Sequence, residues 1–399
     1  MRRRALLGNR VPAGLQYDEK YMTVEALEDG LIVTFDSAVS PSIYYCVNND
    51  GNWFEMSGSS STIAVNTGDC ISFKGVIGET DARYTGIGTF SMNKYCNLLG
   101  NCMSLLYGDE ADTNTVAYAY CFKELFYNCR YIKHVSENFL PATNIGNSSY
   151  SRMFYGCFSL EETPIFYMTN STTSCCRFMF QYCISLTMAY DIKSSSIGND
   201  ACRGMFEGCT SLITAPSLPN VISISNTGCY YMFAGCTSLI NPPKMPKVYE
   251  VGENGCSYMF EGCTSLTTTP TFRIDYTDIQ SCSYMFSMCS KLKTNTITLN
   301  ATILSEYCYE NMFDNCANLT TAPELPATTL VAGCYYEMFN GCTKLNYIKM
   351  LATDISATDC LSSWVNGVAS TGTFVKNADA TWDVSGTSGI PVGWTIETL

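Results

Sequence analysis

Several ingredients of common protein functions are scarce or missing in this sequence of 399 residues. It contains a single histidine, His134, so a Ser–His–Asp or Cys–His nucleophile would have to use that residue. No run of about 18 apolar residues occurs, which excludes a membrane-spanning helix. The formal net charge of −13 argues against a nucleic-acid binder, which would carry a basic stripe. Without Cys-x-x-Cys pairs or a Gly-rich phosphate loop, a metal array and a nucleotide site are also disfavoured.

The sequence does contain one short phrase repeated nine times, Met/Leu-Phe-x-x-Cys-x-x-Leu/Ile. Its phenylalanines are Phe126, Phe154, Phe180, Phe206, Phe233, Phe260, Phe286, Phe313 and Phe339. They recur every 26 to 28 residues. Such a steady period predicts a solenoid, in which each repeat is one coil that buries its apolar face against its neighbours. Elongated repeat bodies usually present surfaces to partners, so the repeat favours binding over catalysis.

Cysteine is abundant, and 18 of the 23 cysteines belong to two columns of the repeat. One column is the Cys of the phrase, and the other lies 4 or 5 residues before the Phe. Cys360 continues the second column, with Trp364 in the place of the Phe. A disulfide framework suits small domains that lack a core, and metal sites need closer pairs. The preferred interpretation is free, buried cysteines that act as small hydrophobic residues, which implies assembly in a reducing cytosol.

The apolar pattern inside one repeat predicts a mixed α/β coil. In the Phe233 repeat, the apolar residues Met232, Phe233, Cys236 and Leu239 follow a helical spacing. The proline-containing tail that follows cannot be helical and must be extended. Each coil is therefore expected to contain a short helix, a turn and a short strand, with neighbouring strands paired at about 4.8 Å.

Four regions are expected along the chain. Residues 1–20 form a basic N-terminal arm and residues 21–105 a small β-sandwich-like module, because short alternating segments there are separated by turn signals. Residues 106–350 are the solenoid of nine coils. Residues 351–399 lose the repeated phrase and are expected to cap the exposed end of its core.

The N-terminal arm begins like a signal peptide, but its apolar stretch is too short for one. It is therefore predicted not to be an export signal. Its arginines could anchor the chain in an acidic groove of a larger assembly, and a frayed terminus is the alternative. These anchoring candidates are Arg2, Arg3, Arg4 and Arg10.

No catalytic residue, metal ligand or cofactor is predicted. His134 lies in a repeat strand and is expected to be a partly exposed strand residue. The acidic cluster 109–112 lacks the spacing of a known cation loop, so a solvated turn is expected. Glu161 and Glu162 are adjacent, and neighbouring strand residues point to opposite faces, which argues against a glycosidase pair.

A candidate binding patch comes from departures between repeats. Ten residues after the Phe most coils carry proline, and thirteen residues after it three coils do, but other coils carry an aromatic or cationic residue at one of these positions. Aromatic residues and arginine are enriched in binding patches, and aromatic surfaces also suit stacking against sugars. Harmless drift between coils is the alternative. The predicted ligand-binding residues are Phe166, Tyr167, Tyr190, Lys193, Tyr249, Arg273 and Tyr276.

The phrase Phe-x-x-Cys-x-x-Leu followed by a proline-bounded strand resembles the BspA-type leucine-rich repeat. Met-Phe-x-Gly-Cys-Thr-Ser-Leu at 205–212, 232–239 and 259–266 is a close match, although the residue before the Phe is usually small in that repeat. With the module and the tail, the chain resembles repeat proteins of gut Bacteroidales phages, including crAss-like phages, and of their hosts. Such proteins are surface adhesins or receptor-binding components of virions, and the resemblance supplies no catalytic residues.

The resemblance implies a non-enzymatic virion adhesin, tail- or fibre-associated, whose solenoid contacts a glycan or protein on the host cell surface. Other virion proteins would bind the arm and the β-module, no nucleic acid or membrane insertion is expected, and a homotrimer is an open option. The alternatives are a structural virion decoration protein and a BspA-like adhesin on the bacterial cell surface. The expected location is accordingly the virion or, alternatively, the bacterial surface.

Overall fold

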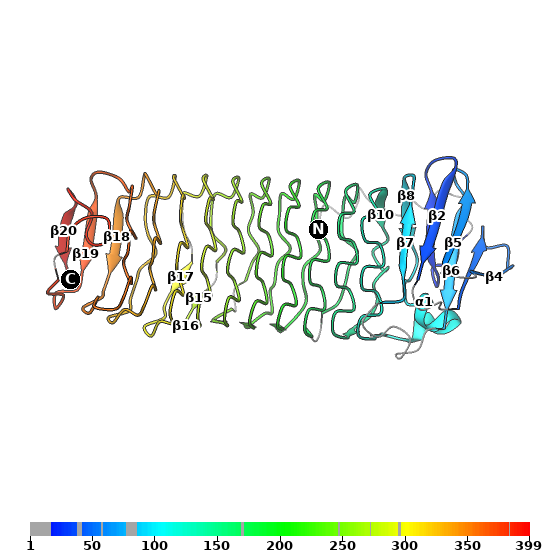
Figure 1. Ribbon diagram of the computed structural model, residues 1–399, viewed down its shortest axis with the longest axis horizontal. Helices are drawn as coiled ribbons and strands as arrows, with labels where there is room; N and C mark the ends of the chain where they lie inside the picture. Colours follow the sequence, from blue (N-terminus) through cyan, green and yellow to red (C-terminus); the bar gives the residue numbers. More distant parts are fainter. Residues whose placement is uncertain are drawn as a thin grey trace.

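The computed structural model describes residues 17–37, 42–56, 59–76, 86–168, 171–245, 248–271, 273–293, 297–382 and 384–399. The molecule is a rod, with a module of β-sheets at one end, a row of stacked coils along its length and three short strands at the other end (Figure 1). Buried apolar side chains form one continuous core from the module to the last coils. The predicted solenoid and the predicted N-terminal β-module are therefore confirmed.

Two sheets pack against each other in the N-terminal module. The larger sheet has the strand order β10-β8-β1-β6-β3-β4, and the smaller has the order β5-β2-β7. The ring of Phe90 lies 4.6 Å from that of Phe35 in its own sheet and 4.9 Å from that of Phe73 in the other, so it joins the two. The module strands are β1 (Met22–Ala26), β2 (Leu31–Asp36), β3 (Ile43–Val47), β4 (Phe54–Glu55), β5 (Ser60–Val65), β6 (Cys70–Gly75), β7 (Thr89–Met92) and β8 (Cys96–Leu99).

The module and the solenoid share a sheet. Strand β10 (Ile132–Val135), in the first coil, pairs in parallel with β8 of the module. The Phe90 N–H donates to the carbonyl of Leu125 at 2.7 Å. The end of the module is therefore bonded to the first coil in the same way as one coil is bonded to the next. At the far end, the Phe339 N–H donates to the carbonyl of Trp364 at 2.8 Å. The solenoid therefore has about 11 turns, rather than the nine predicted from the Phe phrase.

The predicted helix in each coil is wrong. Among the described residues, the only helical segments are α1 (Ser104–Tyr107) and a 3₁₀ segment, η1 (Gly108–Thr113), both beside the module. The repeated phrase instead forms consecutive turns in which every fourth residue has a positive φ. In the Phe233 coil, Thr227, Tyr231 and Gly235 have φ of 54°, 56° and 69°. A left-handed residue at every fourth position is incompatible with an α-helix.

Hydrogen bonds between coils explain why turns replace the helix. The N–H of Cys236 closes a turn on the carbonyl of Phe233 at 3.1 Å. The N–H groups of Phe233 and Gly235 instead donate to Met259 and Glu261 of the next coil, at 2.9 and 2.8 Å. Alternate N–H groups thus serve the coil itself and its neighbour. Because a helix would use nearly all of them within one segment, it could not join the coils in this way.

The other half of each coil is extended, as predicted. Short strands pair in parallel with the equivalent strands of neighbouring coils, and the second residue of most of them is a buried apolar residue. The parallel strands β18, β19 and β20 close the far end. The strands are β9 (Val116–Ala117), β11 (Asn144–Ile145), β12 (Ser196–Ile197), β13 (Ser223–Ile224), β14 (Glu250–Val251), β15 (Arg273–Ile274), β16 (Tyr276–Thr277), β17 (Thr298–Leu299), β18 (Tyr347–Met350), β19 (Thr373–Lys376) and β20 (Thr395–Thr398).

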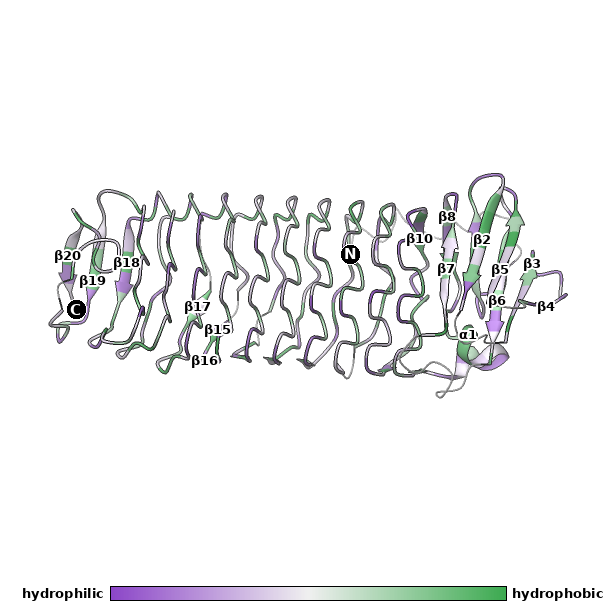
Figure 2. Ribbon diagram, in the orientation of Figure 1, coloured by the Kyte–Doolittle hydropathy of each residue, from purple (hydrophilic) through white to green (hydrophobic). Residues whose placement is uncertain are grey.

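The phenylalanines of the phrase form a continuous ring stack inside the rod. From Phe126 to Phe339, neighbouring ring centroids lie 5.4 to 5.7 Å apart, with planes within 14° of parallel. Hydrophobic and hydrophilic stretches recur along the coils (Figure 2). One phenylalanine in each coil therefore keeps the coils in register and removes a large apolar surface from water.

The predicted burial of the cysteines is confirmed: all 23 are buried and free. The Cys of each phrase also has a specific polar contact. The Sγ of Cys263 donates to the carbonyl of Phe233 in the preceding coil at 3.1 Å, and the same carbonyl accepts the N–H of Cys236. Cysteine suits this position because it is small and apolar and still offers a weak donor to the second lone pair. Burial raises the pKa of the Cys229 thiol to about 12, so it stays protonated.

Candidate binding surfaces of the solenoid

The surface residues predicted from the sequence lie on the extended side of the coils, and one of them is wrong. Phe166 is only 2% exposed, and its ring lies 6.4 Å from that of Phe180 in the core. Alternate residues of an extended segment face opposite sides, so Phe166 points inward while its neighbour Tyr167 is half-buried at the surface. Phe166 therefore cannot contact a partner.

Three of the remaining predicted residues form one group. The Nζ of Lys193 lies 5.7 Å from the ring centroid of Tyr167 in the preceding coil. The hydroxyl of Tyr190 donates to Oε1 of Glu137 at 3.1 Å. Burial and this carboxylate raise the pKa of Tyr190 to about 12, so the hydroxyl remains a donor. The Lys193 ammonium and the Tyr190 hydroxyl of this group therefore already have partners within the protein.

The other three predicted residues form a second group, and the coil of Phe206 separates the two groups. Tyr249 and Tyr276 are 40% and 66% exposed and lie on adjacent coils. Arg273 forms an ion pair with Asp275, with Nε 2.6 Å from Oδ1. The fold therefore does not bring the six surface residues into one contiguous patch, and their role in binding stays a prediction. The anchoring candidates Arg2, Arg3, Arg4 and Arg10 lie outside the described residues.

Nothing in the described part of the chain has the geometry of a catalytic or metal site. His134 lies between two carboxylates, with Nε2 3.8 Å from Glu161 and Nδ1 3.9 Å from Glu162, all three partly exposed. Asp109 of the acidic cluster accepts hydrogen bonds from Tyr21 and Lys74, and these bonds lower the pKa of its carboxyl group. No group of three or more metal-ligating side chains occurs among the residues that the structure describes.

A second surface, which the sequence reasoning missed, lies along the turns. We call Arg152, Arg177 and Arg203 the arginine cluster, because their guanidinium carbons lie 5.6, 4.9 and 5.9 Å from the ring centroid of Phe178. Phe178 lies over Gly204 of the next coil, where a Cβ atom would be 2.4 Å from the ring. The missing side chain at Gly204 thus makes room for the ring that the arginines surround.

An aromatic row lies beside the arginine cluster on the same turns. It consists of Tyr127, Tyr155 and Tyr182 on three successive coils. The rings of Tyr127 and Tyr155 are stacked at 4.8 Å, and that of Tyr182 meets Tyr155 edge-on at 5.6 Å. Tyr127 and Tyr182 are 37% and 40% exposed, so the row offers hydroxyls and exposed ring surface to a partner, although Tyr127 and Tyr155 cover one face of each other's ring.

Further along the rod, the same turns carry a different arrangement. Tyr231, Tyr258 and Tyr284 form a tyrosine stack, with neighbouring centroids 4.6 and 4.7 Å apart. Their faces are occupied by one another, so only ring edges and hydroxyls are available outside. Desolvation raises the pKa of Tyr258 to about 12. The stack therefore contributes to coil packing more than to ligand stacking.

A sequence signal for these residues existed. The column two residues before each Phe contains Arg152, Phe178, Tyr231, Tyr258 and Tyr284, whereas the column used for the prediction lies ten or more residues after it. The earlier column was not part of the predicted patch. Only the turn geometry shows that this column places one residue per coil at the surface along the rod.

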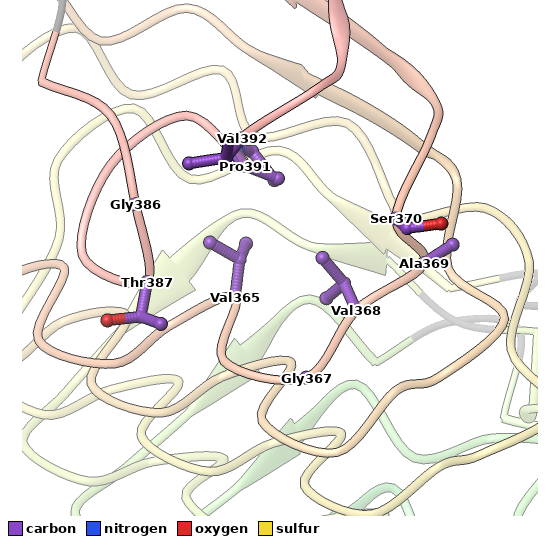
Figure 3. A pocket seen from close by; sticks show the side chains of 9 residues that line it. All are labelled: Val365, Gly367, Val368, Ala369, Ser370, Gly386, Thr387, Pro391 and Val392. Carbon is purple, nitrogen blue, oxygen red and sulfur yellow. The ribbon is translucent and has the colours of Figure 1, made fainter.

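A shallow hollow occurs near the C-terminal end (Figure 3). It has a volume of about 170 Å³ and is lined mainly by small and apolar residues, including Val365, Val368 and Pro391. It contains no charged side chain, and its only side-chain polar groups are the hydroxyls of Ser370 and Thr387. The hollow therefore lacks the convergent polar groups that orient a small ligand.

Six copies of the BspA type leucine rich repeat match residues 117–240 and 256–359 of this chain. The chain belongs to this family. Proteins with BspA-type repeats typically bind partners and are not enzymes. In the described residues of this family member, no helix is long and apolar enough to cross a membrane. No curated protein matches the chain.

Two solved structures of leucine-rich repeat proteins are similar to this BspA-type chain. One is a leucine-rich repeat protein from Bacteroides ovatus, with 17% identity over 69% of this chain and 80% of that chain and a TM-score of 0.31. The other is a leucine rich cell surface protein from Faecalibacterium prausnitzii, with 17% identity over 66% of this chain and 90% of that chain and a TM-score of 0.26.

Proposed function

We propose that the chain is a non-enzymatic binding protein displayed on a bacterial cell surface, where its solenoid contacts a glycan or protein of a host or neighbouring cell. One observation carries the proposal: the turns present a continuous row of arginine and aromatic side chains over several coils. Aromatic residues and arginine are the types that binding surfaces enrich. Membership of the BspA-type repeat family supports a binding role.

The virion adhesin implied by the sequence resemblance shares this binding role and differs in where the chain is displayed. Labelling of intact bacteria that express the protein, with an antibody against the solenoid, tests the location. Surface labelling that protease treatment of intact cells removes is expected for the proposed function. Protein found only inside cells, or only in purified virions, would contradict display on the bacterial surface.

Binding itself is tested with the purified, fluorescently labelled chain on a panel of intact epithelial and bacterial cells. Saturable binding that excess unlabelled protein displaces is expected on at least one cell type. The control is the same protein after thermal unfolding, which should not bind specifically. Folded, soluble protein that binds no cell in the panel would argue against a role in adhesion and for a structural role.

A further inference from the structure

We propose that the arginine cluster and the aromatic row form a binding site for an acidic polysaccharide, a chain that carries carboxylate or sulfate groups. This inference rests on the proposed function and names the chemistry of its partner.

The first argument is an excess of donors in the arginine cluster. Arg152 pairs with Glu124 at 3.2 Å, and Arg203 pairs with Asp200 at 3.1 Å, each through a single guanidinium nitrogen. Arg177 has no ion pair among the residues that the structure describes. Each guanidinium offers five N–H donors in a planar fork that matches carboxylate or sulfate oxygens. The cluster thus retains many donors for an incoming anion.

The second argument is that the cluster is costly without an anion. The Nε atoms of Arg177 and Arg203 are buried and have no hydrogen-bond partner among the described residues. Burial, reinforced by the neighbouring Arg203, lowers the pKa of Arg177 from its usual range. Unpaired and like-charged groups in a partly buried site are unfavourable. An anion bound beside the guanidinium groups would offset the repulsion between their charges, although it would not reach the buried Nε atoms.

The third argument is the aromatic row, which favours a saccharide over a simple anion. Arg152 and Tyr155 lie three residues apart in the same turn, so charged and aromatic groups alternate across the ridge. Where no neighbouring ring covers it, tyrosine offers an apolar ring surface to the C–H face of a sugar, and its hydroxyl can bond to the sugar's polar edge. Arg177 and Tyr182 lie on the next coil, so a linear polymer lying along the rod would meet a cation and an aromatic ring on two successive coils.

The fourth argument is that this arrangement is local. Glu207 also lies near the cluster, where it accepts a hydrogen bond from Gln181 at 2.7 Å. Further along the same turns there is no arginine, and Glu310, Asp314 and Glu337 take the equivalent surface. With a net charge of −13, the chain as a whole repels polyanions. Binding is therefore expected to depend on this one site and to weaken with salt.

The first experiment measures binding of the full chain to polygalacturonate and dextran sulfate by titration calorimetry, with neutral dextran and poly-glutamate as controls. At least one of the acidic polysaccharides should bind, about tenfold or more tightly than either control, which is the factor for one charge-assisted hydrogen bond. The two acidic probes separate carboxylate from sulfate recognition. Equal binding of poly-glutamate would show a charge effect without saccharide recognition and would overturn the proposal.

Matched variants then locate the site. Arg177→Gln should weaken binding about tenfold, and Arg177→Lys should weaken it less because the charge remains. Lys291→Gln makes the same change in net charge on a distant, exposed part of the solenoid and should leave affinity within about twofold. Tyr182→Ala should weaken binding, whereas Tyr276→Ala on the other side of the coils should not.

Equal effects of Arg177→Gln and Lys291→Gln would overturn the assignment of the site. The outcome also separates this inference from the proposed function. Cell binding that neither acidic polysaccharide competes for, and that Arg177→Gln leaves unchanged, would reject the saccharide site and keep the binding role. Absence of specific cell binding by the unmodified protein would reject the proposed function itself.

Discussion

The coils of residues 148–212 and those of residues 254–345 have the same interior and different surfaces. In both regions, the Phe rings are stacked 5.4 to 5.7 Å apart, and each phrase cysteine donates to a Phe carbonyl of the preceding coil. The turns of the first region carry the arginine cluster, whereas those of the second carry most of the tyrosine stack and a ladder in which Asn340 donates to Asp314 at 2.7 Å. The residues that stabilise the rod and those proposed to bind a partner therefore lie in separate columns of the repeat.

The largest expected effect is the unfolding of both regions at alkaline pH. Burial raises the pKa values of Cys129, Cys229 and Cys282 to about 12, whereas an unfolded thiol titrates near about 8.5. Between these values the unfolded chain releases protons that the folded chain retains, so the free energy of unfolding falls as pH rises. Each such thiol contributes a decrease of about 1.4 kcal/mol per pH unit.

Circular dichroism and thiolate absorbance, followed together during a pH titration, measure this effect. Unfolding and thiolate formation should coincide above about pH 9, with no change at lower pH from this cause. Folded protein whose thiols ionise near their normal pKa would show that the cysteine columns are accessible to solvent.

The next largest effect should be equal in the two regions. Phe206→Ala and Phe286→Ala each remove a fully buried ring from the stack, and each should lower the free energy of unfolding by about 3–5 kcal/mol. Chemical denaturation measures both, with Tyr276→Ala as an exposed control that should change stability by less than about 0.5 kcal/mol. A clear difference between the two Phe variants would mean that the surface columns also set stability.

A smaller effect is expected in the cysteine column. Cys209→Ala and Cys289→Ala should each cost about 1 kcal/mol, because a weak donor and a small volume are lost. Valine at either site should cost more, about 1–3 kcal/mol, since the packed neighbouring coils leave no room for it. The denaturation midpoints give the ranking. Valine tolerated better than alanine would contradict the requirement for a small residue.

The smallest effect concerns outward residues with positive φ. Met288 has φ 60°, whereas Gly262 and Gly341 occupy the same position of other coils. Met288→Gly should therefore raise stability by up to about 1 kcal/mol, partly offset by the greater freedom of glycine in the unfolded chain. Tyr182→Gly, in the first region, should also relieve backbone strain but weaken polysaccharide binding. A thermal shift assay beside a binding assay on both variants tests this separation, and destabilisation by Met288→Gly would contradict it.

Much of the architecture was predictable because the repeat is its own internal alignment. The regular Phe and Cys columns predicted stacked coils with buried thiols, and alternation predicted strands such as β2 in the module. The helix was predicted wrongly, because Met232, Phe233 and Cys236 satisfy a helical spacing and a chain of four-residue turns equally well. The choice between them depends on hydrogen bonds to residues 25 to 27 positions away, which no local pattern contains.

The candidate site, too, was only partly predictable from the sequence. The predicted patch was based on coils that depart from the repeat, but it included the buried Phe166 and used the extended side. Arg152, Arg177 and Arg203 occupy two different columns of three repeats, so their convergence on Phe178 is not visible in one dimension.

The repeat period alone is enough to specify a solenoid of BspA-type repeats with a buried core, because a fixed period of apolar residues can be buried only by stacking. The left-handed residues in the turns and the three arginines around one ring follow from the folded arrangement of the coils. Both outcomes arise from contacts between coils, where backbone donors and long side chains find partners one repeat away rather than along the chain.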